Sequence, residues 1–174
     1  MTRSVADALA LVRVVPDFPE PGVLFRDLGP VFADGAAFHA LVDALAEHVD
    51  PTADILVAVE ARGFILGAAL SRATGLGVVP VRKPGKLPMV AQSVQYQLEY
   101  GTTTLELPAD LLRPGQRAVI VDDVLATGGT IGATRELVEG AKASVAGVVV
   151  AIELVDLGGR VRLDGLPIHT LMSL

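Results

Sequence analysis

Residues 118–130 read Ala-Val-Ile-Val-Asp-Asp-Val-Leu-Ala-Thr-Gly-Gly-Thr. The first four are apolar and mostly β-branched, which predicts a fully buried strand. Asp122 and Asp123 follow at the end of that strand, and a short loop closes in the Thr-Gly-Gly-Thr of 127–130. Apolar residues then recur near helical spacing over 130–139. The stretch therefore predicts a strand, an acidic pair, a glycine-rich loop and a helix, in that order.

The loop has the chemistry of a phosphate-binding site. It leads into a helix N-terminus, which offers unpaired backbone N–H groups and about half a positive charge. Gly128 and Gly129 have no Cβ and let the backbone approach an anion, while Thr127 and Thr130 add hydroxyl donors. No lysine follows the glycines, so this is not the phosphate loop of nucleoside-triphosphate hydrolases.

The acidic pair has the chemistry of a site for a sugar diol. Ionised carboxylates only accept hydrogen bonds, and vicinal hydroxyls are donors of matching geometry. Neighbours along a strand point to opposite faces, so we do not expect Asp122 and Asp123 to reach a ligand equally. A monophosphate on N–H groups beside a diol on carboxylates describes a ribose 5-phosphate. The alternative interpretation is structural: a strand that ends in an Asp-Asp turn before a glycine-rich helix cap.

Taken together, residues 119–130 resemble the phosphoribosyl-pyrophosphate motif of type I phosphoribosyltransferases. The resemblance implies that Asp122 and Asp123 hold the ribose hydroxyls. It also implies that the following loop binds the 5′-phosphate, through Ala126, Thr127, Gly128, Gly129 and Thr130.

Composition limits the remaining classes. The 174 residues suit one domain, 1–174, and a hydrophobic content of 51% with only 4% aromatic residues suits an aliphatic α/β core. A net charge of −6 without a run of Lys and Arg disfavours a nucleic-acid partner. The absence of cysteine excludes disulfides and thiolate metal sites and fits a cytoplasmic setting. The N-terminus lacks a signal-peptide core, and the apolar run 145–152 is too short to cross a bilayer.

Short apolar strands alternate with helices through most of the chain. This alternation predicts an α/β fold with a parallel twisted sheet flanked by helices on both faces, whose ligands bind beyond the carboxyl ends of the strands. A short helix is expected to start at Ser4, and 23–28 is expected to be extended. Inside the helix at 64–73, Ile65, Ala68 and Ala69 are expected to face inward. The predicted strands are 55–59, 78–81, 118–121, 145–152 and 168–171, and the other predicted helices are 34–49 and 130–139.

A long excursion at 82–116 interrupts the alternation. Loops of this length inside a compact domain are usually lids or binding loops, so we expect part of it to be a flexible flap.

Two segments at predicted strand ends carry cations. The segment Glu60-Ala61-Arg62-Gly63 resembles the family's pyrophosphate loop, which implies a pyrophosphate site there and a non-proline cis peptide near Ala61–Arg62. The basic loop that contains Arg82 and Lys86 can neutralise a pyrophosphate leaving group, and Arg-Lys-Pro-Gly-Lys-Leu-Pro at 82–88 resembles a signature of the adenine phosphoribosyltransferases. Without the family, both segments read as turns with solvated cations.

Leu-Glu-Tyr-Gly at 98–101 looks like the flap motif of the same enzymes. The resemblance implies that Glu99 approaches N7 of the purine as the catalytic acid, with Tyr100 beside it in the flap. Hypoxanthine–guanine enzymes carry an Asp where this chain has Ala126, which cannot transfer a proton, so Glu99 is the available candidate. Phe25 and Arg26 resemble the adenine-binding segment.

Leu154 follows a predicted strand end and is a candidate to cover the base, with ordinary packing as an equally good interpretation. The resemblance implies transfer of the phosphoribosyl group to adenine, giving AMP and pyrophosphate in purine salvage. It also implies a homodimer, and Mg²⁺ that is held through the substrate rather than by a protein cage. Transfer to another purine, and a non-catalytic sensor of phosphoribosyl pyrophosphate, are the alternatives.

Overall fold

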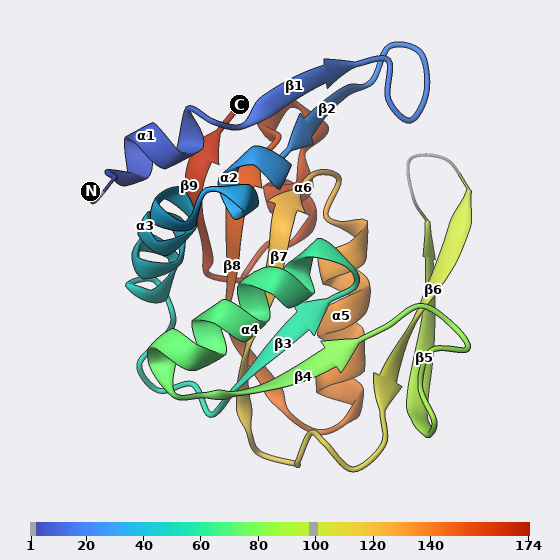
Figure 1. Ribbon diagram of the computed structural model, residues 1–174. Helices are drawn as coiled ribbons and strands as arrows, with labels where there is room; N and C mark the ends of the chain where they lie inside the picture. Colours follow the sequence, from blue (N-terminus) through green and yellow to red (C-terminus); the bar gives the residue numbers. More distant parts are fainter. Residues whose placement is uncertain (1–2, 98–100) are drawn as a thin grey trace. The chain divides into compact units, whose positions relative to one another are not determined.

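The computed structural model describes residues 3–97 and 101–174 (Figure 1). The chain divides into two compact units, residues 1–44 and residues 45–174. The second unit contains the central sheet and most of the candidate site residues. The two units are described in turn.

The first unit combines short helices with one antiparallel strand pair. Ser4 Oγ accepts a hydrogen bond from the N–H of Asp7 at 3.1 Å, and Asp7 accepts one from the N–H of Ser4, so the predicted helix start is confirmed. The first strand and the second helix were not predicted, because segments of four or five residues carry too little periodicity. The elements are α1 (Val5–Leu9), β1 (Arg13–Pro16), β2 (Leu24–Asp27), α2 (Gly29–Ala33) and α3 (Gly35–Ala46), the last ending just inside the second unit.

The second unit is built on a five-stranded sheet in the order β4-β3-β7-β8-β9. All four strand pairs are parallel, which confirms the predicted sheet. Strand β7 lies at the centre and is flanked by β3 and β8, and it is longer than predicted at both ends. The strands are β3 (Ile55–Val59), β4 (Gly77–Val81), β7 (Arg117–Leu125), β8 (Ser144–Glu153) and β9 (Ile168–Ser173).

Helices α4 (Arg62–Thr74) and α5 (Gly129–Gly140) cover opposite faces of this sheet (Figure 1). The β3–α4–β4 and β7–α5–β8 crossovers run toward opposite edges, and right-handed crossovers then place their helices on opposite faces. The side chains on the two faces of the sheet confirm this arrangement. Ile120 belongs to the apolar cluster that includes Leu137 of α5, whereas Ala58 faces α4.

The buried face of α4 differs from the prediction. Ile65 is 43% exposed and Ala68 is exposed, while Leu66 and Leu70 are buried together with Gly63 and Gly67. A Cβ on Gly67 would stand 2.5 Å from Cβ of Ala58, so the helix lies against β3 along its glycines. A count of apolar side chains does not detect a helix face made partly of glycine.

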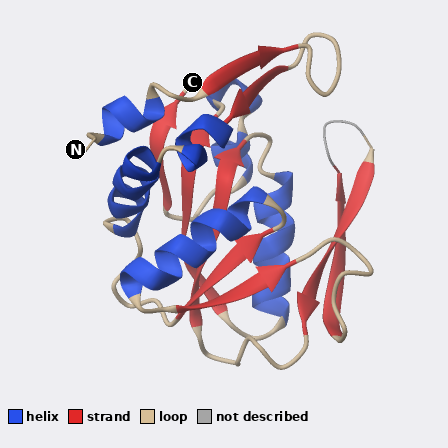
Figure 2. Cartoon of the chain, in the orientation of Figure 1, coloured by secondary structure: helices blue, strands red, loops and turns tan. Residues whose placement is uncertain are grey.

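The excursion at 82–116 is largely an antiparallel hairpin of β5 (Val90–Gln97) and β6 (Thr102–Pro108) (Figure 2). Its two strands were not predicted, because β5 is polar and only alternately half-buried. Gln92 Nε2 donates to the carbonyl of Leu137 in α5 at 2.6 Å, and the backbones of Arg82 and Glu106 exchange two hydrogen bonds. The hairpin is therefore attached both to α5 and to the end of β4.

After β8 the chain makes a short 3₁₀ turn, Val155–Leu157, and the four-residue helix α6 (Gly159–Arg162) before it enters β9. Over the described ranges, 3–97 and 101–174, we find no helix with the length and apolar character needed to cross a membrane.

Candidate active site

Four segments meet at one edge of the sheet, beyond the carboxyl ends of parallel strands. They are Glu60–Gly63 after β3, Arg82–Lys86 after β4, the end of β7 with its loop to α5, and Leu154 after β8. Parallel pairing places these four strand ends on the same side of the sheet. The edge thus brings together predicted site residues that are far apart in the sequence.

Asp122 and Asp123 lie within β7, since that strand continues to Leu125 rather than ending at Val121. Both are almost fully buried, at 9% and 5% exposed. Asp123 Oδ2 lies 2.7 Å from Nε of Arg62 at the start of α4, and Asp122 Oδ1 accepts the N–H of Asp123 at 2.8 Å. The two acids therefore have different partners, as expected for neighbours on a strand.

Burial raises the pKa of Asp122 well above its ordinary value, and the charge of Asp123 raises it further. Gly63 contributes to this environment. A Cβ at that position would stand 2.8 Å from the carbonyl oxygen of Val121 and 3.1 Å from Asp122 Oδ1, so only glycine lets α4 begin directly against the acid. The site thus holds a carboxylate that is costly to ionise without a ligand.

The predicted phosphate loop leaves β7 at Ala126 and enters α5. Gly128 is the N-cap of the helix with φ 79°, a left-handed conformation that favours glycine, and no side chain caps the helix. The N–H groups of the first turn are left for a ligand, and the positive end of the helix dipole faces the same side. Thr127 and Thr130 are both half-buried in or next to this loop.

The pyrophosphate candidates are linked by Glu60. Its Oε2 accepts the N–H of Lys83 at 2.9 Å and Nε of Arg82 at 3.3 Å, and Arg82 Nη1 donates to the carbonyl of Lys86 at 3.1 Å. These contacts lower the pKa of Glu60, and the hydrogen bond from the Lys83 N–H has the largest effect. Glu60 therefore holds the basic loop in place, while the Lys86 side chain is exposed. The non-proline cis peptide is Glu60–Ala61, one bond before the predicted position.

The base-binding candidates are placed only in part. Phe25 and Arg26 lie on β2 of the first unit. Leu154 is half-buried, and its N–H donates to the carbonyl of Leu125 at 2.8 Å, which ties the end of β8 to the end of β7. Glu99 and Tyr100 lie outside the described residues.

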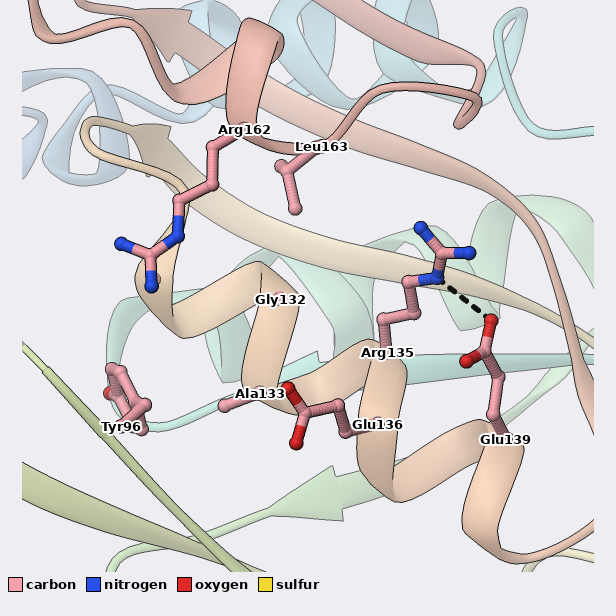
Figure 3. Close-up of a pocket in the computed structure, with 9 residues that line it drawn as sticks. Tyr96, Gly132, Ala133, Arg135, Glu136, Glu139, Arg162 and Leu163 are labelled. Atoms are coloured by element: carbon pink, nitrogen blue, oxygen red, sulfur yellow. Dashed lines mark hydrogen bonds and ion pairs between the residues drawn. The ribbon is translucent and has the colours of Figure 1, made fainter.

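Three further side chains near the loop carried no motif and were missed. Tyr96 on β5 places its hydroxyl 3.2 Å from Oγ1 of Thr130, and its pKa is raised, mainly by burial. Arg160 of α6 makes a bidentate pair with the buried Glu153, through Nη2 at 2.6 Å and Nε at 2.9 Å. Arg162 lines a cavity of about 300 Å³ beside α5 (Figure 3). The sequence offered one signal among these three residues: Tyr96 is one of only two tyrosines in the chain.

Comparison with known proteins identifies the family. Residues 32–162 match the model of the phosphoribosyl transferase domain. An adenine phosphoribosyltransferase from Saccharopolyspora erythraea is 57% identical over 166 residues, which cover 95% of this chain and 90% of the relative. Another from Desulfitobacterium hafniense is 52% identical and covers 93% of this chain and 94% of the relative.

Solved structures agree with the sequences. The crystal structure of adenine phosphoribosyltransferase from Thermoanaerobacter pseudethanolicus superposes with a TM-score of 0.94 at 45% identity, covering 98% of this chain and 100% of that one. The Saccharomyces cerevisiae enzyme, solved with an imino-altritol bisphosphate and adenine, gives 0.91 at 37% identity, with coverage of 96% and 97%. Fold, sequence and family model point the same way: the chain belongs to the adenine phosphoribosyltransferases, a family of pentosyltransferase enzymes.

Proposed function

We propose that this edge of the sheet transfers the 5-phosphoribosyl group of phosphoribosyl pyrophosphate to N9 of adenine, giving AMP and pyrophosphate. One observation carries the proposal. Two buried carboxylates and an uncapped helix N-terminus follow one another on β7 and α5, so acceptors for a diol stand next to donors for a phosphate. The named relatives support adenine as the base.

The sugar phosphate is assigned to the end of β7. Asp122 and Asp123 accept hydrogen bonds from the ribose 2′- and 3′-hydroxyls, and the backbone N–H groups of 126–130 with the hydroxyls of Thr127 and Thr130 take the 5′-phosphate. The ion pair of Asp123 with Arg62 fixes the position of that carboxylate at the sugar end of the site. Binding at both ends orients C1′ of the sugar.

The pyrophosphate is assigned to the ends of β3 and β4. The bond from C1′ to the pyrophosphate oxygen breaks while the bond to N9 forms, so positive charge develops on the sugar and negative charge on the leaving group. Arg62, Arg82 and Lys86 are proposed to stabilise that negative charge, together with the backbone of Ala61 and Gly63. Glu60 acts by holding Arg82 and the Lys83 backbone.

The base is assigned to Phe25, Arg26 and Leu154, with Glu99 at the purine N7 and Tyr100 in the flap. These five assignments rest on the family resemblance of the segments that contain them. Adenine that carries its imidazole proton on N7 attacks C1′ through N9 and must lose that proton. Ala126 brings no titratable group to the base, so Glu99 is proposed to take the proton from N7. Closure of a water-excluding segment over the site protects the activated sugar from hydrolysis.

Mg²⁺ is proposed as the cofactor that arrives with phosphoribosyl pyrophosphate. Magnesium prefers oxygen ligands, and substrate phosphates with one or two carboxylates are its usual donors. The proposed site fits an ion held through the substrate, because Asp122 and Asp123 are buried at the sugar end and are assigned to the ribose hydroxyls. When bound, the ion supplies positive charge for the leaving pyrophosphate. A homodimer in the cytoplasm completes the proposal, and light scattering after size-exclusion chromatography tests the assembly.

The sugar assignment is tested by the double variant Asp122→Ala/Asp123→Ala. We expect titration calorimetry to show no binding of phosphoribosyl pyrophosphate with Mg²⁺, because the diol loses both acceptors. Circular dichroism serves as the control for folding. An affinity equal to that of the unmodified protein would remove the acids from the site.

The proton assignment is tested by Glu99→Gln. A positioned group that transfers a proton typically contributes about 10²–10⁴-fold, so we expect kcat with adenine to fall by that order while binding of phosphoribosyl pyrophosphate stays nearly unchanged. Rapid-quench assays with adenine, hypoxanthine, guanine and xanthine measure both the rate and the base. Normal turnover of the variant would exclude Glu99, and turnover of another base in place of adenine would change the proposed substrate.

A further inference from the structure

Arg162 differs from the other arginines near the candidate site in its ion pairing. Within the described part of the chain, the other arginines near the site each contact a carboxylate: Arg62 contacts Asp123, Arg82 contacts Glu60, Arg135 contacts Glu139, and Arg160 contacts Glu153. Arg162 has no such ion pair there. A guanidinium is charged at every physiological pH, so this one is available to an anion.

The guanidinium lies at the start of α5. Arg162 Nη1 stands 3.7 Å from the point where a Cβ on Gly129 would lie, next to the first helical N–H groups. Figure 3 shows it directed toward the beginning of α5, whereas Arg135, on the same cavity, is directed toward Glu139. The cavity of about 300 Å³ that both arginines line reaches the loop at Gly129 and continues along α5 past Glu136 and Glu139.

The backbone under Arg162 is held against the phosphate loop. A Cβ on Gly128 would stand 2.8 Å from the carbonyl oxygen of Gly159, and one on Gly159 would stand 3.0 Å from the N of Gly128. Leu163 is 2% exposed and lies close to Gly128. The chain on both sides of Arg162 therefore packs on the loop.

Arg160 fixes the same segment from the other side. Its Nη1 donates to the carbonyl of Ile168 at 3.0 Å, and its Nη2 and Nε hold Glu153 at the end of β8. With Arg160 committed to these acceptors, Arg162 is the cation of α6 that faces the loop.

We propose that Arg162 is a binding residue for the 5′-phosphate, a cation that adds to the N–H groups of the loop from the α6 side. The inference rests on the proposed function, because it assumes that the loop at 126–130 takes that phosphate. The chemistry supports it: a phosphate monoester carries nearly two negative charges at neutral pH, and Asp122 and Asp123 lie just before the loop. An added cation offsets their repulsion.

The test compares Arg162→Gln with Arg135→Gln, which removes a guanidinium from the same cavity that is already paired. Calorimetry measures binding of two probes, ribose 5-phosphate and magnesium pyrophosphate. We expect Arg162→Gln to weaken ribose 5-phosphate by about 3- to 30-fold, leaving pyrophosphate within twofold, and Arg162→Lys to recover part of the loss. Kinetically, the KM for phosphoribosyl pyrophosphate should rise with kcat changed less than twofold.

A third variant, Thr127→Val/Thr130→Val, separates this inference from the function on which it rests. If it weakens ribose 5-phosphate and Arg162→Gln does not, the role of Arg162 is wrong and the loop assignment stands. If neither variant weakens binding of ribose 5-phosphate, the loop assignment itself is wrong, and the inference about Arg162 is wrong with it. Equal losses in Arg162→Gln and Arg135→Gln, or equal losses for both probes, would also overturn the role of Arg162.

Discussion

Asp122 combines a cost in stability with a proposed role in binding the ribose. It is buried beside Asp123 and Gly63, and its pKa in the folded protein is raised above the ordinary value of 3.8. The folded state therefore holds a proton that the unfolded state has already released. Stability from this group is fully present below the unfolded pKa and is lost as the pH rises toward the folded pKa. At neutral pH, well above the ordinary pKa of the group, Asp122 therefore lowers the free energy of unfolding.

The variant Asp122→Asn tests this account. An amide keeps the shape and carries no charge, so we expect the melting temperature to exceed that of the unmodified protein at pH 7 and the difference to shrink as the pH falls. Binding of phosphoribosyl pyrophosphate should be strongly weakened. Calorimetric melts in a series of buffers measure the first effect. A variant that is less stable than its parent at every pH would contradict the raised pKa.

For single residues, the sequence predicted which residues are candidates for the site better than it predicted their side-chain contacts. Motifs predicted Asp122, Asp123 and Arg62 as site residues, whereas the 2.7 Å contact of Asp123 with Arg62 was not foreseen. That contact joins the end of one strand to the start of a helix that follows another, and no local pattern encodes it. Arg162 and Glu153 carried no motif, and their surroundings depend on how α6 packs.

Single elements show where periodicity succeeds and where it fails. Helix α5 was predicted within one residue at each end, because Ile131, Leu137 and Val138 recur near helical spacing on its buried face. Strand β3 was predicted with its observed bounds for the same reason. Helix α4 was predicted at the correct position, but the prediction of its buried face was wrong, since Gly63 and Gly67 form part of that face. The hairpin of β5 and β6 was read as a loop, because its strands pair with each other rather than with the central sheet.

The hairpin also supplies a prediction about Tyr96. Its half-buried hydroxyl lies 3.2 Å from Thr130, and its raised pKa keeps it protonated near neutral pH. We expect Tyr96→Phe to lower the free energy of unfolding by about 0.5–1.5 kcal/mol and to raise the KM for phosphoribosyl pyrophosphate severalfold, because the Thr130 hydroxyl loses a partner that orients it. Denaturant melts and initial rates measure the two effects.

Gln95→Ala is the matched control for Tyr96, because Gln95 is the exposed neighbour on the same strand. It should leave both quantities unchanged. A Tyr96→Phe protein with an unaltered KM would restrict Tyr96 to packing of the hairpin.

The proposed site draws on four strand ends of the central sheet, so we expect ligand binding to stabilise the fold of the second unit. Ligand at a hundred times its Kd adds about 2.7 kcal/mol to the free energy of unfolding. For a chain of 174 residues we expect saturating phosphoribosyl pyrophosphate with Mg²⁺ to raise the melting temperature by roughly 5–10 °C. Differential scanning fluorimetry measures the shift, and adenine alone is the comparison ligand. The absence of any shift with the sugar phosphate would argue against a site spread over this edge.

The strand order β4-β3-β7-β8-β9 was not predictable, although the parallel sheet was. Alternating strands and helices imply parallel pairing, but nothing in the pattern says which strand lies in the centre. Because the excursion separates β4 from β7, the sequence does not indicate that β7 pairs with β3 rather than with β4. Order depends on crossovers over tens of residues, beyond the reach of local periodicity.

The late arrival of the central strand has a consequence for the nascent polypeptide. Ile55 of β3 pairs with Ala118 of β7, so one side of β3 has no neighbour until the ribosome has made the intervening segment. At about 5–20 residues per second, that delay lasts roughly 3–13 s. During this interval only β3 and β4 can form the sheet, with one hydrogen-bonding edge of β3 still open. A translational pause before residue 117 would prolong this exposure and make the growing chain more dependent on chaperones.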